Sequence, residues 1–111
     1  MFEYSEKYKL TFKSDARETG LAACGQMIGA DIKYRKKHIG RIHRNSLHVQ
    51  DACKYTVGFS VNKPENGRWV WVYFKMKFDT MEEAREWASD NFKAIIDNFQ
   101  SKGWTIHEID Y

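Results

Sequence analysis

A dense run of cations over residues 33–44 is the part of this sequence best suited to bind phosphate. The run reads KYRKKHIGRIHR and holds six Lys or Arg and two His. Arginine can bridge phosphate oxygens with two hydrogen bonds, and each neutralised phosphate releases counterions. The candidate binding residues here are Lys33, Arg35, Lys36, Lys37, Arg41 and Arg44, and we expect the last five to contact phosphates. Two other interpretations stay open: an exposed hairpin whose lysines prevent edge-to-edge pairing, and a basic half that balances an acidic half.

A second candidate surface is a segment on which large aromatic residues alternate with valines, over residues 69–73. Such rings can stack the bases of single-stranded nucleic acid, at about 1–3 kcal/mol per base. Trp, Tyr and Arg also dominate protein interfaces, so a protein partner is an alternative. A third interpretation is a small second core, covered by residues 14–30 or by a second copy in a homodimer. The candidate residues are Arg68, Trp69, Trp71, Tyr73 and Lys75, with Lys77 expected on the same face.

The sequence contains no motif that predicts catalysis or metal binding. It has no glycine-rich phosphate loop, no Gly-x-Ser-x-Gly elbow and no His-Glu-x-x-His. Its four His and two Cys lack the close pair spacing of zinc ligands. Cys24 and Cys53 lie among apolar or small residues, which predicts reduced, partly buried thiols. We therefore expect a protein without enzymatic activity, a metal site or a cofactor.

A hairpin is the element that must position the aromatic residues. Apolar residues alternate with polar ones over residues 55–61, and alternate again over residues 70–78. Between them, Pro64 and the Asn66–Gly67 pair predict a turn. A four-residue loop would pair Val61 with Val70, which places the aliphatic residues on a core face and the tryptophans on the other.

A long helix is predicted directly after this hairpin, over residues 80–102. Apolar side chains recur there at steps of three and four residues from Met81 to Phe99. Thr80 with Glu83, or Asp79 with Glu82, forms the capping pattern of a helix start. We expect a final strand over residues 104–111 to return to the sheet.

The first half of the chain shows weaker patterns. Residues 7–13 alternate and predict a strand with Tyr8, Leu10 and Phe12 inward. Residues 19–29 could form a short helix, residues 32–42 predict a second hairpin turning near residues 36–37, and residues 45–52 show no regular element. The predicted fold is α+β: an antiparallel sheet of about five to six strands, including two hairpins, packed on one long C-terminal helix and followed by a last strand.

Length and charge restrict the classes of protein to which this chain can belong. The 111 residues predict a single domain, 1–111, and no apolar run is long enough for a membrane span. The start of the chain lacks the pattern of a secretory signal, so we expect a cytoplasmic protein. The net charge of +3 conceals a balance of +9 over residues 33–77 and −5 over residues 78–111. We expect a binding protein that docks on nucleic acid or a nucleoprotein through the basic hairpin and the aromatic strand. The alternative is a small protein-binding inhibitor or adaptor, of the kind that phages and mobile elements encode, acting through the same aromatic face.

Overall fold

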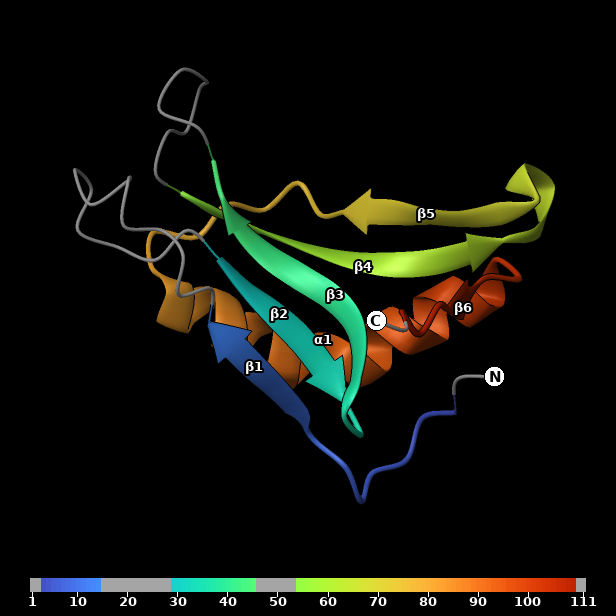
Figure 1. The fold of residues 1–111 in the computed structure, drawn as a ribbon, viewed down its shortest axis with the longest axis horizontal. Helices are drawn as coiled ribbons and strands as arrows, with labels where there is room; N and C mark the ends of the chain where they lie inside the picture. The colour runs from blue at the N-terminus through green and yellow to red at the C-terminus, as the bar shows by residue number, and fades with distance from the viewer. Residues whose placement is uncertain (1–2, 15–28, 46–53, 110–111) are drawn as a thin grey trace.

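The computed structural model describes residues 3–14, 29–45 and 54–109 of the 111-residue chain. Within these residues six strands form one antiparallel sheet, in the order β1-β2-β3-β4-β5 with β6 also paired to β4, and the helix α1 lies behind it (Figure 1). The elements are β1 Leu10–Ser14, β2 Gly29–Tyr34, β3 Lys37–Arg44, β4 Tyr55–Lys63, the 3-10 turn η2 Pro64–Asn66, β5 Arg68–Tyr73, α1 Met81–Ser101 and β6 Thr105–Ile106. The predicted α+β class is therefore confirmed, with its antiparallel sheet, its long C-terminal helix and its last strand.

The β4–β5 hairpin has the register that the alternating sequence predicts. The cross-strand pairs are Lys63 with Arg68, Val61 with Val70, Phe59 with Val72, and Gly58 with Tyr73. Pro64 opens the turn and Gly67 ends it with a φ of 69°, a conformation that glycine adopts at little cost because it has no Cβ. Valines and Phe59 therefore face α1, while the aromatic residues of β5 face the other way.

The helix α1 begins where the capping pattern with Thr80 predicts. Thr80 is the N-cap, and its hydroxyl accepts a hydrogen bond of 3.1 Å from the amide of Glu83. The alternative start at Asp79 is wrong, since this carboxylate instead accepts a 2.6 Å hydrogen bond from Lys54. The helix runs from Met81 to Ser101, one residue shorter at each end than the predicted range. Its apolar face is the predicted one, with Ala84, Ala88, Phe92, Ile95, Ile96 and Phe99 buried.

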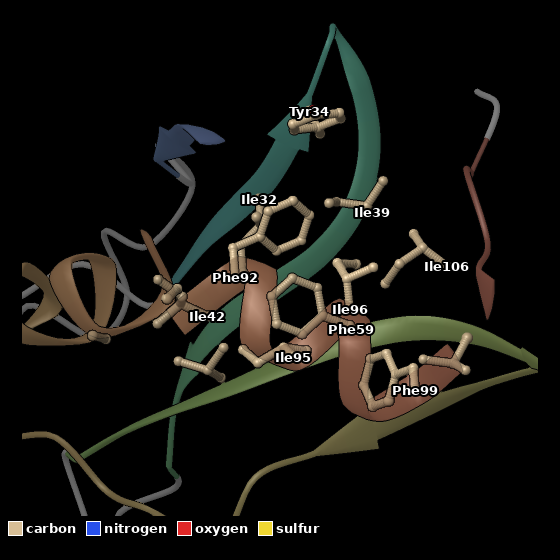
Figure 2. Close-up of a cluster of buried hydrophobic side chains, with 14 of the residues drawn as sticks. Ile32, Tyr34, Ile39, Ile42, Phe59, Phe92, Ile95, Ile96, Phe99 and Ile106 are labelled. Atoms are coloured by element: carbon tan, nitrogen blue, oxygen red, sulfur yellow. The ribbon is translucent and has the colours of Figure 1, made fainter. Parts of the chain in front are cut away.

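The hydrophobic core lies between α1 and one face of the sheet. Figure 2 shows side chains of the strands and of α1 gathered there, with Phe59 and Phe92 near the centre. The rings of these two residues stack, with centroids 5.9 Å apart. Ile32, Ile42, Val57 and Val61 are fully buried on the sheet side. The helix α1 therefore covers this face of the sheet.

A β-bulge in the β2–β3 hairpin decides what β3 presents on the opposite face of the sheet. Ile32 pairs with Gly40, but Lys33 pairs with His38, so Ile39 is an extra residue on β3. A bulge of this kind changes which face the preceding residues point to. Ile39 is consequently buried in the core, and His38 lies beside Lys33 on the face away from α1.

The C-terminal segment, residues 105–109, lies in a fork between β3 and β4 (Figure 1). It bonds to β4 through the amide of His107, which donates to the carbonyl of Ser60 at 2.9 Å, and to β3 through Ile109, which donates to His38 at 2.8 Å. The buried hydroxyl of Ser60 shares its proton between the carbonyl oxygens of His107 and Ile39, at 2.7 and 3.0 Å. The predicted last strand is thus present, but only Thr105–Ile106 has strand geometry.

Three expectations for the first half differ from the structure or fall outside it. The first strand is Leu10–Ser14, so Tyr8 precedes it and is 43% exposed rather than inward. Its ring packs under the guanidinium of Arg35, 4.6 Å away, while Leu10 and Phe12 do contact the core. The second hairpin turns at Arg35 and Lys36, one residue earlier than expected. The expected helix over 19–29, both cysteines and most of 45–52 lie outside the described residues, apart from Gly29, which begins β2.

Candidate functional site

A row of aromatic rings crosses the sheet face that points away from α1. We call the rings of Trp69, Trp71, Tyr73, His43 and His107 the aromatic row. Successive centroids lie 4.9 Å apart from His107 to Trp69, 5.7 Å from Trp69 to Trp71, 6.1 Å from Trp71 to Tyr73, and 5.2 Å from Tyr73 to His43. The planes of Trp71 and Tyr73 differ by only 18°, so these two rings are nearly parallel. No helix or strand in the described part of the chain covers it.

Tyr73 owes its position to a glycine on the neighbouring strand. The ring occupies the space over Gly58, where a Cβ would lie 2.5 Å from Cδ1 and 2.6 Å from Cε1 of Tyr73. Any larger residue would push the ring off β4, because carbon atoms normally stay about 3.5–4.0 Å apart. Tyr73 is 47% exposed in this position, which makes it the most accessible ring of the aromatic row.

Tertiary contacts bring both histidines to the aromatic row. His107 stacks on Trp69 with a plane angle of only 9°, because the C-terminal segment lies in the fork beside β4. His43 is on the same face as Tyr73 through the register of β3 with β4, where it pairs with Thr56. Neither histidine is among the site residues predicted from the sequence. The alternation along β3 could have indicated His43, whereas no local pattern points to His107.

Charged groups lie beside the aromatic row on β2 and β3. Arg41 Nη1 donates a 2.9 Å hydrogen bond to Asp31 Oδ1. The nearly buried His38 places Nε2 3.5 Å from the same oxygen, and its ring centroid is 6.2 Å from that of Trp71. Arg41 thus lies on the face of the aromatic row, but a carboxylate already neutralises part of its charge.

The pKa of His43 reports the electrostatic character of this face. Partial burial lowers the pKa below the usual value of 6.5, and the positive charges of Arg41 and Lys77 lower it further. Both effects act against the protonated imidazole. Burial is the larger cause of the lowered pKa, and the two nearby cations add to it.

The basic hairpin tip has an unusual backbone. Arg35 and Lys36 have φ values of 53° and 69°, so both occupy the left-handed region. Residues with a Cβ pay about 1–2 kcal/mol each for this conformation, and the matching two-residue turn ordinarily carries Asn or Gly. Arg35, Lys36 and Lys37 are all exposed there, with Arg35 resting on Tyr8.

Two predicted site residues do not join this surface. Arg44 is only 7% exposed and pairs with Tyr55 on the side of the sheet that faces α1, so it does not present its charge to a ligand. Arg68 pairs with Lys63 and shares the side of Val70, not that of Trp69. The expectation that Arg68 lies on the face of the aromatic row is therefore wrong, because alternation along a strand sends neighbouring residues to opposite faces. Lys33 is on the sheet face that points away from α1, which we call the open face, and Lys75 is exposed just after β5.

The described residues contain little that indicates another kind of site. In the described ranges, no three His, Cys, Asp or Glu side chains gather closely enough to hold a metal ion. No helix there is long and apolar enough to cross a membrane. Comparisons of the chain with protein-family models, with curated proteins and with solved structures find no match. Function therefore has to be inferred from the chemistry of the open sheet face.

Proposed function

We propose that this protein binds single-stranded nucleic acid on the sheet face that carries the aromatic row. The observation that supports this most is the pair Trp71 and Tyr73, two nearly parallel rings that no helix or strand of the described residues covers. Every base has a π-face, so such a surface accepts bases without regard to sequence. A base on each ring would contribute about 1–3 kcal/mol.

The distribution of charge also favours binding of a polyanion on the face that carries the aromatic row. Lys33, Arg41, Lys75 and Lys77 lie on or beside the open face, and the hairpin tip adds three exposed cations. The opposite side of the molecule is the acidic helix, where Glu82, Glu83, Glu86, Asp90 and Asp97 are exposed. A polyanion would therefore be steered toward the aromatic row and repelled by α1.

The strain at the hairpin tip is a second supporting feature. Arg35 and Lys36 hold a costly left-handed conformation although Asn-Gly would hold it with less strain. Strained backbone tends to persist where side chains have a function. Two cations at this turn are suited to contact phosphates at one end of the bound strand.

The test is direct binding of labelled single-stranded oligonucleotides of about ten nucleotides, RNA and DNA, as a function of salt. If three phosphates are neutralised, log Kobs falls with log salt concentration at a slope of about −2. Trp71→Ala is expected to weaken binding about 5- to 150-fold, and Trp71→Phe, which keeps a ring, to restore most of the affinity. No binding at low salt, or binding that salt does not weaken, would refute the proposal.

A matched pair of lysines separates specific contact from overall charge. Lys75 is exposed two residues after Tyr73, whereas Lys93 is on α1 and donates a 2.9 Å hydrogen bond to Asp97. Lys75→Gln and Lys93→Gln change the net charge equally. Only Lys75→Gln is expected to weaken binding and to reduce the salt slope, by about 0.7.

The second candidate function is binding of a protein partner, as an inhibitor or adaptor. It is favoured by the pairing of Arg41 with Asp31, which leaves the centre of the face less cationic than its margins. Aromatic residues with a polar rim are typical of interface hot spots. If the wild-type chain binds no oligonucleotide while Trp71→Ala loses a partner protein, this second function is the correct one.

A further inference from the structure

The outer edge of β5 is an unpaired strand edge whose free backbone groups can be identified. In an antiparallel pair, alternate residues turn both their N–H and C=O toward the neighbouring strand. The amide of Phe74 donates to Val57 on β4 at 3.0 Å, so Val72, Val70 and Arg68 also turn toward β4. Trp69, Trp71 and Tyr73 therefore turn their backbone groups away from the sheet. In the described residues these groups have no hydrogen-bond partner.

This edge lacks the features that normally prevent a strand from pairing. Proteins protect sheet edges with lysines, prolines, bulges or very short strands. The sequence of β5, RWVWVY, has neither lysine nor proline, and its register with β4 is regular over six residues. The outermost strand on the other side of the sheet, β1, by contrast carries a lysine, Lys13, within the strand itself.

We propose that a second copy of this chain pairs with β5 edge to edge, antiparallel, about a two-fold axis at Trp71. Opposed residues exchange both hydrogen bonds only when both turn their backbone outward. Centring the pair on Trp71 sets Trp71 against Trp71 of the second copy and Trp69 against Tyr73, so all three outward residues take part. A shift by two residues in either direction leaves one outward residue of each strand unused.

The side chains in this register are complementary to themselves, which favours a second copy over an unrelated strand. On the open face, aromatic rings lie opposite aromatic rings, and such cross-strand pairs are among the most stabilising in sheets. On the helix side Val70 lies opposite Val72, and Arg68 lies opposite Phe74, so no like charges are directly opposed. The two aromatic rows would join into one surface across the dimer. The inference does not depend on the proposed function, because the pairing needs no nucleic acid.

The first experiment measures the mass of the full wild-type chain in solution by sedimentation, without nucleic acid. A chain of 13.2 kDa is expected to sediment as a dimer of about twice that mass as its concentration rises. A constant monomer mass over the whole concentration range would overturn the proposal.

A cysteine trap then tests the register, in a Cys24→Ser/Cys53→Ser background. Opposed residues at Trp71 would have Cα atoms about 5.5 Å apart, within disulfide range. The two copies of Tyr73 would be offset by four residues, about 14 Å along the strand, and could not be bridged. Trp71→Cys is expected to convert to a disulfide-linked dimer under mild oxidation, while Tyr73→Cys alone stays monomeric.

A mixture of two variants completes the trap. Trp69→Cys and Tyr73→Cys proteins are expected to crosslink to each other when mixed, although neither crosslinks with itself. Equal crosslinking of all three cysteine variants, or a dimer in which Trp71→Cys does not crosslink, would show that another surface pairs and would overturn the proposal. Each variant's far-ultraviolet circular dichroism confirms that it is folded.

Discussion

Replacing Gly58 by alanine should remove one ring from the aromatic row while leaving the fold intact. The added Cβ would lie 2.5 Å from Cδ1 and 2.6 Å from Cε1 of Tyr73. Normal carbon contacts are about 3.5–4.0 Å, so the ring has to move by about 1 Å or more. Tyr73 is 47% exposed and can rotate toward solvent, whereas the β4 backbone is held by strands on both sides. We therefore expect the Tyr73 side chain to move and the β4 backbone to stay in place.

Gly58→Ala should affect both stability and binding. Moving the ring breaks its edge contact with His43, 5.2 Å away, and its stacking with Trp71, 6.1 Å away, and each contact contributes about 0.5–1.5 kcal/mol. Alanine in a strand regains about 0.5–1 kcal/mol relative to glycine, because it loses less conformational freedom on folding. The free energy of unfolding should thus fall by no more than about 2.5 kcal/mol. If one base stacks on Tyr73, the affinity for single-stranded nucleic acid falls by about 1–3 kcal/mol, or 5- to 150-fold.

Three measurements test this prediction of Gly58→Ala. Urea unfolding gives the stability, fluorescence anisotropy of a labelled oligonucleotide gives the affinity, and the NMR shifts of the His43 ring protons report whether the Tyr73 ring has left. In a Tyr73→Ala background the added Cβ meets no ring, so Gly58→Ala should there be stabilising and have no effect on binding. Unchanged His43 shifts in Gly58→Ala, or an equal loss of affinity in both backgrounds, would refute the reasoning.

Three further predictions concern other parts of the sheet. Ser60→Ala removes a fully buried hydroxyl and should cost about 1–3 kcal/mol in urea unfolding, whereas Ser89→Ala on the exposed side of α1 should change stability by less than about 0.5 kcal/mol. Arg35→Asn with Lys36→Gly should raise stability by about 1 kcal/mol or more, yet lower the salt slope of oligonucleotide binding by about 1; an unchanged slope would exclude the tip from the contact. The pKa of His43 is held below 6.5 in the folded chain, so the unfolded chain takes up the proton at a higher pH, and stability should fall as the pH drops below about 6.5. Urea midpoints measured from about pH 7.5 to 5 should show this fall, and His43→Gln should make it smaller.

The parts of the fold that were predicted correctly depend on short-range patterns. In the β4–β5 hairpin, alternation and a Pro-x-Asn-Gly turn set the register of Val61 with Val70, and the structure has that register. In α1, apolar spacing and the Thr80 cap define the start and the buried face. Each of these signals involves residues within a few positions of each other. Local backbone geometry therefore suffices to interpret them.

The parts of the site that were missed depend on long-range contacts. From the sequence, Arg44 was predicted to contact phosphate together with the other cations of the basic run. In the tertiary structure it is buried on the side of the sheet that faces α1. The bulge at Ile39 moves His38 to the open face. The amino-acid composition of residues 33–44 does not predict a bulge at this position. His107 reaches Trp69 only because the C-terminal segment inserts between β3 and β4.

Sequence alone determined that this protein has a basic half, an acidic helix and a strand whose aromatic and aliphatic residues face opposite ways. These properties follow from composition and from the two-residue period of a strand. Only the tertiary structure decided which cations stand beside the rings, and that Gly58 leaves room for Tyr73. It also decided that the backbone N–H and C=O groups of Trp69, Trp71 and Tyr73 point away from β4, at an edge of the sheet that no described strand pairs with. The physical reason is that these facts depend on strand order and register, which join residues far apart in the chain through hydrogen bonds that no local pattern encodes.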